Sequence, residues 1–159
     1  MQDLAKEVGK LLRSKGLSLG LVESATGGLI SDHITDVAGS SDYYNGSITT
    51  YGNRAKIDLV GVRQESLEKY GAVSPQVAEE MARGGRQALA ADICLSDSGI
   101  AGPGGATTAK PVGLFYVALA FKDRTDSRRY LFSGDRQQNK QQAAKAALKW
   151  LKEYLLELD

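Results

Sequence analysis

The chain has 159 residues with a formal net charge of +1, and 42% of its residues are hydrophobic. A chain of this length can bury one proper core, so we expect a single domain over residues 1–159. The near-neutral charge argues against a nucleic-acid partner or a general attraction to anionic membranes. No apolar run approaches the roughly 20 residues of a membrane span, and the start lacks a signal-peptide core, which predicts a cytoplasmic protein with no membrane partner.

Cysteine and histidine are too scarce for the commonest metal sites. The chain has one cysteine, Cys94, within an apolar run, where a small buried side chain is expected. Its one histidine is His33. A zinc site needs about three or four N, S or O ligands close together, and the sequence shows no such cluster. We therefore expect neither a metal nor a cofactor.

Apolar periodicity predicts alternating helices and strands. The predicted helices span residues 3–15, 28–37 (opened by Thr26 and Gly27), 54–60, 64–70, a longer segment beginning at Ser74-Pro75, and 137–156. The predicted strands span residues 17–23, 43–51, 93–95, 114–121 and 128–132, with Arg124-Thr125-Asp126 as a hairpin turn. Gly84-Gly85 inside the longer helix predicts close packing against a neighbour. The order predicts an α/β fold, a three-layer α/β/α sandwich with a mixed sheet.

Two glycine-bearing loops follow predicted core strands and suggest one shared site. They are Glu23–Gly28 and Ser98–Gly105, the second closing at Lys110–Gly113. Glycine contributes no side chain to the core, but it lets a ligand approach the backbone and its N–H groups. Neither loop is a P-loop or a G-x-G-x-x-G fingerprint, so an NTPase or a dinucleotide dehydrogenase is not supported. The substrate-binding candidates are Thr26, Gly27, Gly28, Ser98, Gly102, Gly104, Gly105 and Arg136.

Arg136 is a candidate because it lies in the first turn of the last helix. A cation there opposes the helix dipole, so stability alone favours an acid at this position. Arginine beside free N-terminal amides suits a phosphate.

Ser24 is the first candidate nucleophile, because it lies where a strand ends and a helix begins. A role as a simple helix cap is the alternative. His33 lies too far along the following helix to reach back as a base. Lys56, in a locally apolar setting, could act as the base if burial lowers its pKa, although most lysines are solvated surface residues. Tyr51 could relay a proton or orient the lysine.

Seven blocks of the sequence resemble one family in order and in register. They are Glu23–Gly28, Ala38–Ser41, Tyr51–Lys56 with Gly61-Val62, Gly71–Ser74, Ser98–Gly105, Lys110–Gly113 and Ser133–Arg136. Together they resemble the C-terminal domain of competence/damage-inducible protein CinA, a family with stand-alone bacterial nicotinamide-nucleotide amidases. The resemblance covers almost the whole chain.

The resemblance implies an amidohydrolase that converts nicotinamide mononucleotide to nicotinate mononucleotide and ammonia by a serine–lysine mechanism without a metal. It places Ser24, Ser41, Tyr51, Lys56, Ser98 and Arg136 on the family's active-site positions. The nucleophile stays open at this point: the end of a strand favours Ser24, whereas Ser41 is nearer to Lys56 in sequence. By family analogy we also expect a homodimer.

Four positions depart from the family's usual residues and leave room for an altered substrate or weak activity. They are Ala25, Gly52, Arg54 and Ser98. The main alternative is a non-catalytic module that binds a pyridine nucleotide or a partner protein. A nucleic-acid-binding competence factor fits poorly with the near-neutral charge.

Overall fold

Five strands form one mixed sheet in the order β2-β1-β3-β4-β5 in a computed structural model, which describes residues 1–158. β1 (Leu19–Glu23), β2 (Tyr44–Thr49) and β3 (Ile93–Gly99) are parallel to one another. β4 (Leu114–Phe121) pairs antiparallel with β3, and β5 (Arg124–Leu131) pairs antiparallel with β4. The predicted single-domain α/β fold with a mixed sheet is confirmed.

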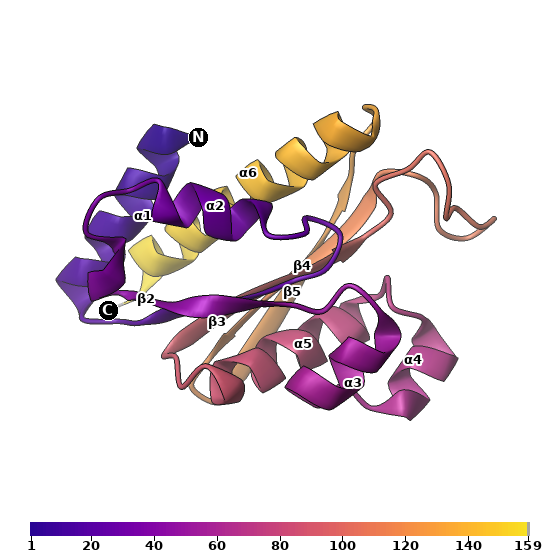
Figure 1. Cartoon of the computed structure of the whole chain (residues 1–159), viewed down its shortest axis with the longest axis horizontal. Helices are drawn as coiled ribbons and strands as arrows, with labels where there is room; N and C mark the ends of the chain where they lie inside the picture. Colours follow the sequence, from indigo (N-terminus) through magenta and orange to yellow (C-terminus); the bar gives the residue numbers. More distant parts are fainter. Residues whose placement is uncertain (159) are drawn as a thin grey trace.

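Helices cover both faces of this sheet and complete the predicted three layers (Figure 1). One face carries α1 (Gln2–Lys15), α2 (Leu29–Thr35) and α6 (Arg136–Glu157). The other carries α3 (Asn53–Val60), α4 (Gln64–Tyr70) and α5 (Pro75–Ala88). No helix within residues 1–158 is long and apolar enough to cross a membrane.

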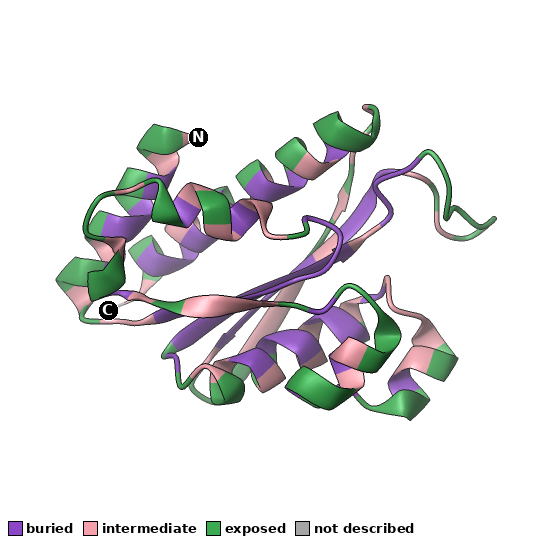
Figure 2. Cartoon of the chain, viewed as in Figure 1, coloured by how far each residue is buried: buried purple, intermediate pink, exposed green. Residues whose placement is uncertain are grey.

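The core lies on both sides of the central strands, which are buried along most of their length (Figure 2). Leu21 and Leu95 pack on the face covered by α1, α2 and α6. Val22 and Cys94, which adjoin Leu21 and Leu95 in their strands, pack with Met81 on the face covered by α5. Cys94 is buried as expected, and burial raises the pKa of its thiol to about 12. Alternation along β1 and β3 therefore divides the core between the two helical layers.

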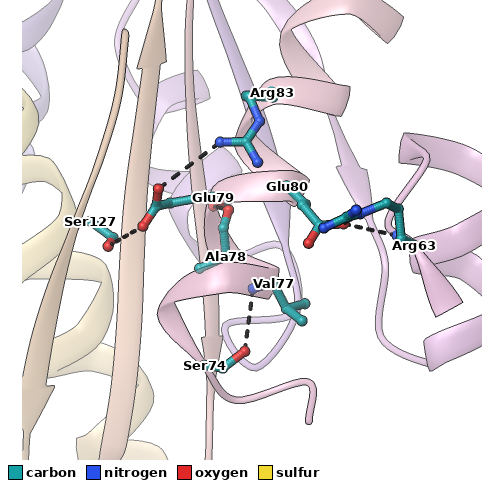
Figure 3. A network of polar contacts seen from close by, with 9 residues as sticks. Arg63, Ser74, Val77, Ala78, Glu79, Glu80, Arg83 and Ser127 are labelled. Carbon is teal, nitrogen blue, oxygen red and sulfur yellow. Dashed lines mark hydrogen bonds and ion pairs between the residues drawn. The ribbon is translucent and has the colours of Figure 1, made fainter. Parts of the chain in front are cut away.

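Polar contacts hold α5 at its start and along its exposed side (Figure 3). The Ser74 hydroxyl accepts a hydrogen bond from the Val77 N–H at 3.2 Å, which caps the helix. Ser127 of β5 donates to Glu79 at 2.7 Å. Glu80 and Arg83 on α5 form further ion pairs, with Arg63 and Glu79 respectively.

The two glycines inside α5 lie where the helix touches its neighbours most closely. A Cβ on Gly84 would lie 1.6 Å from the Val60 carbonyl oxygen, and a Cβ on Gly85 would lie 2.1 Å from the Val22 side chain. The close packing predicted for this pair is confirmed. This contact fixes α3, and with it Lys56, against α5 and the sheet.

Two local predictions were wrong. The β4–β5 hairpin turns at Lys122-Asp123, because Phe121 pairs with Arg124, so Arg124–Asp126 belong to β5 rather than to the turn. The strand predicted over residues 93–95 continues to Gly99, so Ser98 lies in β3 rather than in a loop. Both errors have the same cause. Polar residues indicate a turn or loop only where they are not paired with a neighbouring strand, and here they are paired.

Candidate active site

The candidate site lies at the edge of the sheet where the three parallel strands end. Ser24 follows β1, Thr50 follows β2, and Gly99 is the last residue of β3. The chain leaves β1 toward β2 on one side and returns to β3 on the other, so the strand order reverses between β1 and β3. Ligands of open α/β sheets bind in the crevice at such a point.

Ser24 and Lys56 meet at this edge. Lys56, on α3, is only 1% exposed. Its Nζ lies 3.0 Å from Ser24 Oγ, 2.7 Å from the Thr50 carbonyl oxygen and 3.1 Å from the Tyr51 carbonyl oxygen. The structure thus joins two residues that are 32 positions apart in the chain.

The surroundings of Lys56 favour the neutral amine. Burial lowers its pKa, and the negative charge of Asp97 opposes that shift to a smaller extent. Within residues 1–158, no carboxylate forms an ion pair with Lys56. The two carbonyls can only accept, so they can take both N–H groups of a neutral amine and leave its lone pair for the Ser24 hydroxyl hydrogen. This is the geometry of a nucleophile with its base.

A buried acidic cluster lies behind Ser24. Glu23 accepts hydrogen bonds from the N–H groups of Gly28, Ile30 and Ser31, and so holds the start of α2. Asp97 accepts from the N–H groups of Thr26, at 3.1 Å, and of Ser24, at 3.3 Å.

Burial and the charge of Glu23 raise the pKa of Asp97 to about 7. The turn that carries Ser24 is therefore held from beneath by two carboxyl groups, one of which titrates near neutral pH.

A cleft of about 320 Å³ opens in front of Ser24. Its lining residues are Ser24, Ala25, Tyr51, Lys56, Ala72, Val73, Ser98, Gly99, Ile100, Ala101, Gly102, Gly104, Gly105 and Arg136. The Arg136 guanidinium donates to the Gly102 carbonyl at 2.7 Å and to the Tyr51 hydroxyl at 3.3 Å. Arg136 therefore ties the glycine loop to the segment that bears Lys56. The volume suits a small molecule.

Three predicted substrate-binding residues lie outside this lining. Thr26 is buried, the Gly27 N–H donates to the Ser24 carbonyl, and the Gly28 N–H donates to Glu23. These groups build the turn beneath Ser24 and are occupied. Among residues 1–158, the Ala25 N–H has no acceptor, so it is the free donor next to Ser24.

The structure does not bring Ser41 to the cleft. Ser41 is exposed in a short turn (Ser40–Asp42) before β2, whereas Thr50 and Lys56 follow the other end of that strand. Six residues of strand separate the two ends, a span of roughly 20 Å. Nearness in sequence was a misleading signal here, because the extended strand carries the chain away from Ser41.

Sequence reasoning missed Ala72, Val73, Thr50 and Asp97 as parts of the site. Ala72 accepts a hydrogen bond from the Ser98 hydroxyl at 2.7 Å, so the segment before α5 forms one wall. A signal for Asp97 exists, since an acidic residue lies two positions after the apolar run that ends at Leu95.

The model of the CinA C-terminal domain family matches residues 1–155. The chain belongs to this family. It is 46% identical over 155 residues to a competence-damage inducible protein of Caldicellulosiruptor saccharolyticus, covering 98% of this chain and 38% of that protein. It is 48% identical over 149 residues to a CinA-like protein of Geotalea daltonii, covering 94% and 36%. The chain therefore spans under two fifths of these curated relatives.

Solved structures of the CinA family share the whole fold. The competence damage-inducible protein A of Klebsiella pneumoniae superposes with a TM-score of 0.96 at 32% identity, covering 99% of this chain and 98% of that one. The competence/damage inducible protein CihA of Agrobacterium tumefaciens gives a TM-score of 0.94 at 34% identity, covering 98% and 95%. The expected family membership is confirmed, and these names state no reaction.

Proposed function

We propose that this CinA-family chain is a serine–lysine amidohydrolase that acts on the carboxamide of nicotinamide mononucleotide. The proposal is carried by the buried Lys56 amine, 3.0 Å from Ser24 Oγ and oriented by two backbone carbonyls. The choice of substrate rests on the family resemblance. The cleft in front of Ser24 supports this choice of substrate, because it has the size for a small molecule and its lining includes the Arg136 guanidinium. That cation complements a phosphate.

In the first half of the reaction, the neutral Lys56 amine takes the proton of the Ser24 hydroxyl. Ser24 Oγ then attacks the carboxamide carbon and forms a tetrahedral oxyanion. The Ala25 N–H, directly after the nucleophile, and the N–H groups of the glycine loop at residues 102–105 are the available donors for that oxyanion. The N–H groups of Gly27 and Gly28 are not available for this role, since they are already bonded.

In the second half, the proton held by Lys56 goes to the departing nitrogen, and ammonia leaves an acyl-enzyme on Ser24. Water then attacks the ester carbon with Lys56 again as the base. Nicotinate mononucleotide is released, and Ser24 regains its proton. The original Ser24 proton leaves with ammonia, and a proton from the attacking water, passed through Lys56, replaces it.

Arg136 is the residue proposed to hold the nucleotide phosphate. Its guanidinium has five N–H donors, and the contacts to Gly102 and Tyr51 leave others free. The N-terminal amides of α6 are less suitable than expected, because Asp135 caps this helix and accepts from the Gln138 N–H. A carboxylate at the cap opposes a second anion there.

The test is ammonia release from nicotinamide mononucleotide by the purified protein, with EDTA present. We expect activity in the wild type and in Ser41→Ala, and a loss of at least about 10³-fold in Ser24→Ala and Lys56→Ala. Full turnover in Ser24→Ala or Lys56→Ala would refute the mechanism. Tight nucleotide binding without ammonia release by the wild type would favour the alternative, a module that binds a pyridine nucleotide without catalysis.

A further inference from the structure

Two buried carboxyl groups lie side by side beneath the Ser24 turn. β1 and β3 are parallel with Val22 opposite Ser96, which places Glu23 beside Asp97 at the ends of the two strands. Both residues are fully buried. Two carboxylates cannot both ionise at low cost in such a place, because each charge is desolvated and repels the other.

The donors available around Thr26 determine how the hydrogen bonds of this cluster can be made. Thr26 Oγ1 lies 2.6 Å from Glu23 Oε1 and 2.5 Å from Asp97 Oδ2, and both distances are short hydrogen bonds. A hydroxyl has a single hydrogen to donate, so one of the two carboxyl groups must donate to Thr26.

Glu23 already accepts three backbone N–H groups at the start of α2, which suits the anion. Asp97 is therefore the group that carries the proton.

We propose that Asp97 is a positioning residue that keeps its proton in the active form of the site, donates it to Thr26, and so leaves no anion beside Lys56. The order of donation runs from Asp97 to Thr26 and from Thr26 to Glu23. The N–H groups of Ser24 and Thr26 are held by the same Asp97 side chain, which fixes the turn that presents the nucleophile. The catalytic part of this inference rests on the proposed function.

The charged groups that face Asp97 come from two elements. Glu23 on β1 opposes its ionisation, and Lys56 on α3 responds to its charge. The buried residues of α6 on this side of the sheet, Asn139 and Ala143, carry no charge. Lys140 lies above the turn, with its Nζ 3.9 Å from the position of a Gly27 Cβ.

The neighbour on β4 is the apolar Val117, and α5 packs on the opposite face of the sheet. Burial and Glu23 accordingly hold the pKa of Asp97 at about 7.

Asp97→Asn is the sharpest variant, because an amide NH₂ can donate to Thr26 and its carbonyl can accept from the Thr26 N–H, as the protonated acid does. The Ser24 N–H loses its acceptor in this variant, at a cost in stability that does not depend on pH. The wild-type carboxyl has a raised pKa when folded, from 3.8 to about 7, so its stabilising protonation is lost as pH rises through that window. The ratio of the folding equilibrium constant of Asp97→Asn to that of the wild type should therefore rise by up to tenfold per pH unit between these two pKa values. Above the higher value the ratio should be constant.

Denaturant unfolding from pH 4 to 8.5 measures this difference. Asp123→Asn is the matched control, because Asp123 is exposed in the hairpin turn at the opposite end of the sheet and should follow the wild type at every pH. The ¹³C shift of the Asp97 carboxyl in the wild type gives an independent reading. A midpoint near 7 supports the proposal, whereas a midpoint near 4, or a stability difference that is flat across the window, overturns it.

The catalytic readout is the pH profile of kcat/KM for ammonia release. In the wild type, ionisation of Asp97 above its pKa of about 7 places a negative charge near Lys56 that raises the pKa of the amine and favours its protonated form, so kcat/KM should fall as the pH rises through that value; Asp97→Asn cannot ionise and should lack this fall, whatever its activity at lower pH. A wild-type profile with no fall through pH 7, or a fall that persists in Asp97→Asn, overturns the link to Lys56. If the wild type releases no ammonia, the proposed function fails, and the unfolding and ¹³C experiments still decide whether Asp97 holds its proton.

Discussion

Two polar networks in this molecule contain adjacent acidic residues and use them in opposite ways. On α5, Glu79 and Glu80 face Arg83 and Arg63, at ion-pair distances of 4.0 and 3.5 Å, where the arginines are largely exposed (Figure 3). We call this group, with Ser127, the α5 network. Its charges have partners of opposite sign and stay in contact with water.

The network beneath Ser24 consists of Glu23, Thr26, Asp97 and Lys56, and we call it the Ser24 network. All four residues are at most 1% exposed, and no ion pair within residues 1–158 joins its acids to its lysine. A hydroxyl, backbone N–H groups and carbonyls satisfy it instead. In this fold, the ion pairs of α5 involve exposed arginines, whereas the groups with shifted pKa values, Lys56 and Asp97, are buried together at the candidate site.

The largest expected effect is on catalysis, from removal of the base in the Ser24 network. Lys56→Met keeps an unbranched, slightly shorter side chain and removes the amine, so ammonia release should fall by about 10³-fold or more. Stability should change little, because removal of a buried amine favours folding while the Thr50 and Tyr51 carbonyls lose their hydrogen bonds from Lys56. Ammonia assays and denaturant unfolding on the same preparation check both parts. Retention of a tenth of the activity would exclude Lys56 as the base.

Thr26→Val should give the largest loss of stability. The substitution is close to isosteric, but it removes the hydroxyl between Glu23 and Asp97 and leaves two buried carboxyl groups without it, at a cost of about 2–3 kcal/mol in unfolding free energy. Urea unfolding measures the loss. Thr49→Val, at the exposed end of β2, is the control and should change stability by less than about 0.5 kcal/mol. Equal effects at the two positions would contradict the role given to Thr26.

Ser74→Ala should have a smaller effect, on the α5 side. The hydroxyl caps α5 by accepting from the Val77 N–H, and loss of such a cap costs about 1 kcal/mol. The change should lower the thermal midpoint and leave the pH profile of activity in place. Ser14→Ala, at an exposed position inside α1, is the comparison and should be near neutral. Equal thermal midpoints for Ser74→Ala and Ser14→Ala would show that the cap contributes nothing to stability.

Arg83→Gln should have the smallest effect. The ion pair with Glu79 spans 4.0 Å on one face of α5, and its arginine side chain is 54% exposed. Such pairs contribute about 0.3–0.5 kcal/mol, and salt screens them. Unfolding at low salt should reveal a small loss that disappears in 1 M NaCl. A loss as large as that of Thr26→Val would remove the distinction between the two networks.

The order of helices and strands along the chain could be predicted from the sequence, because each element depends on a local pattern. The helix at residues 64–70 and the strand at residues 114–121 have the predicted bounds. Ser24 could be predicted as a site residue, because a strand, a glycine turn and a helix follow one another there. The hairpin turn could not, because Lys122 adopts a left-handed conformation with φ of 56° although the turn lacks the usual Asn-Gly or Asp-Gly pair.

The partners of the site residues could not be predicted, because they depend on which strands pair. Asp97 meets Glu23 and Thr26 only through the β1–β3 pairing, which joins residues more than 70 positions apart. The choice between Ser24 and Ser41 needed the direction of β2. The family resemblance named both serines, and the structure brings Ser24 alone of the two to the lysine.

The orientation of Lys56 depends on the carbonyl oxygens of residues 50 and 51, and every amino acid carries a carbonyl. Mutations at Thr50 or Tyr51 can therefore alter size, polarity or ligand contacts without deleting an acceptor of the lysine. What has to be inherited is the course of the main chain between β2 and α3. Sequences can change at these two positions while the Lys56 amine keeps its orientation, which leaves room for one scaffold to bind different ligands beside an unchanged Ser24–Lys56 pair.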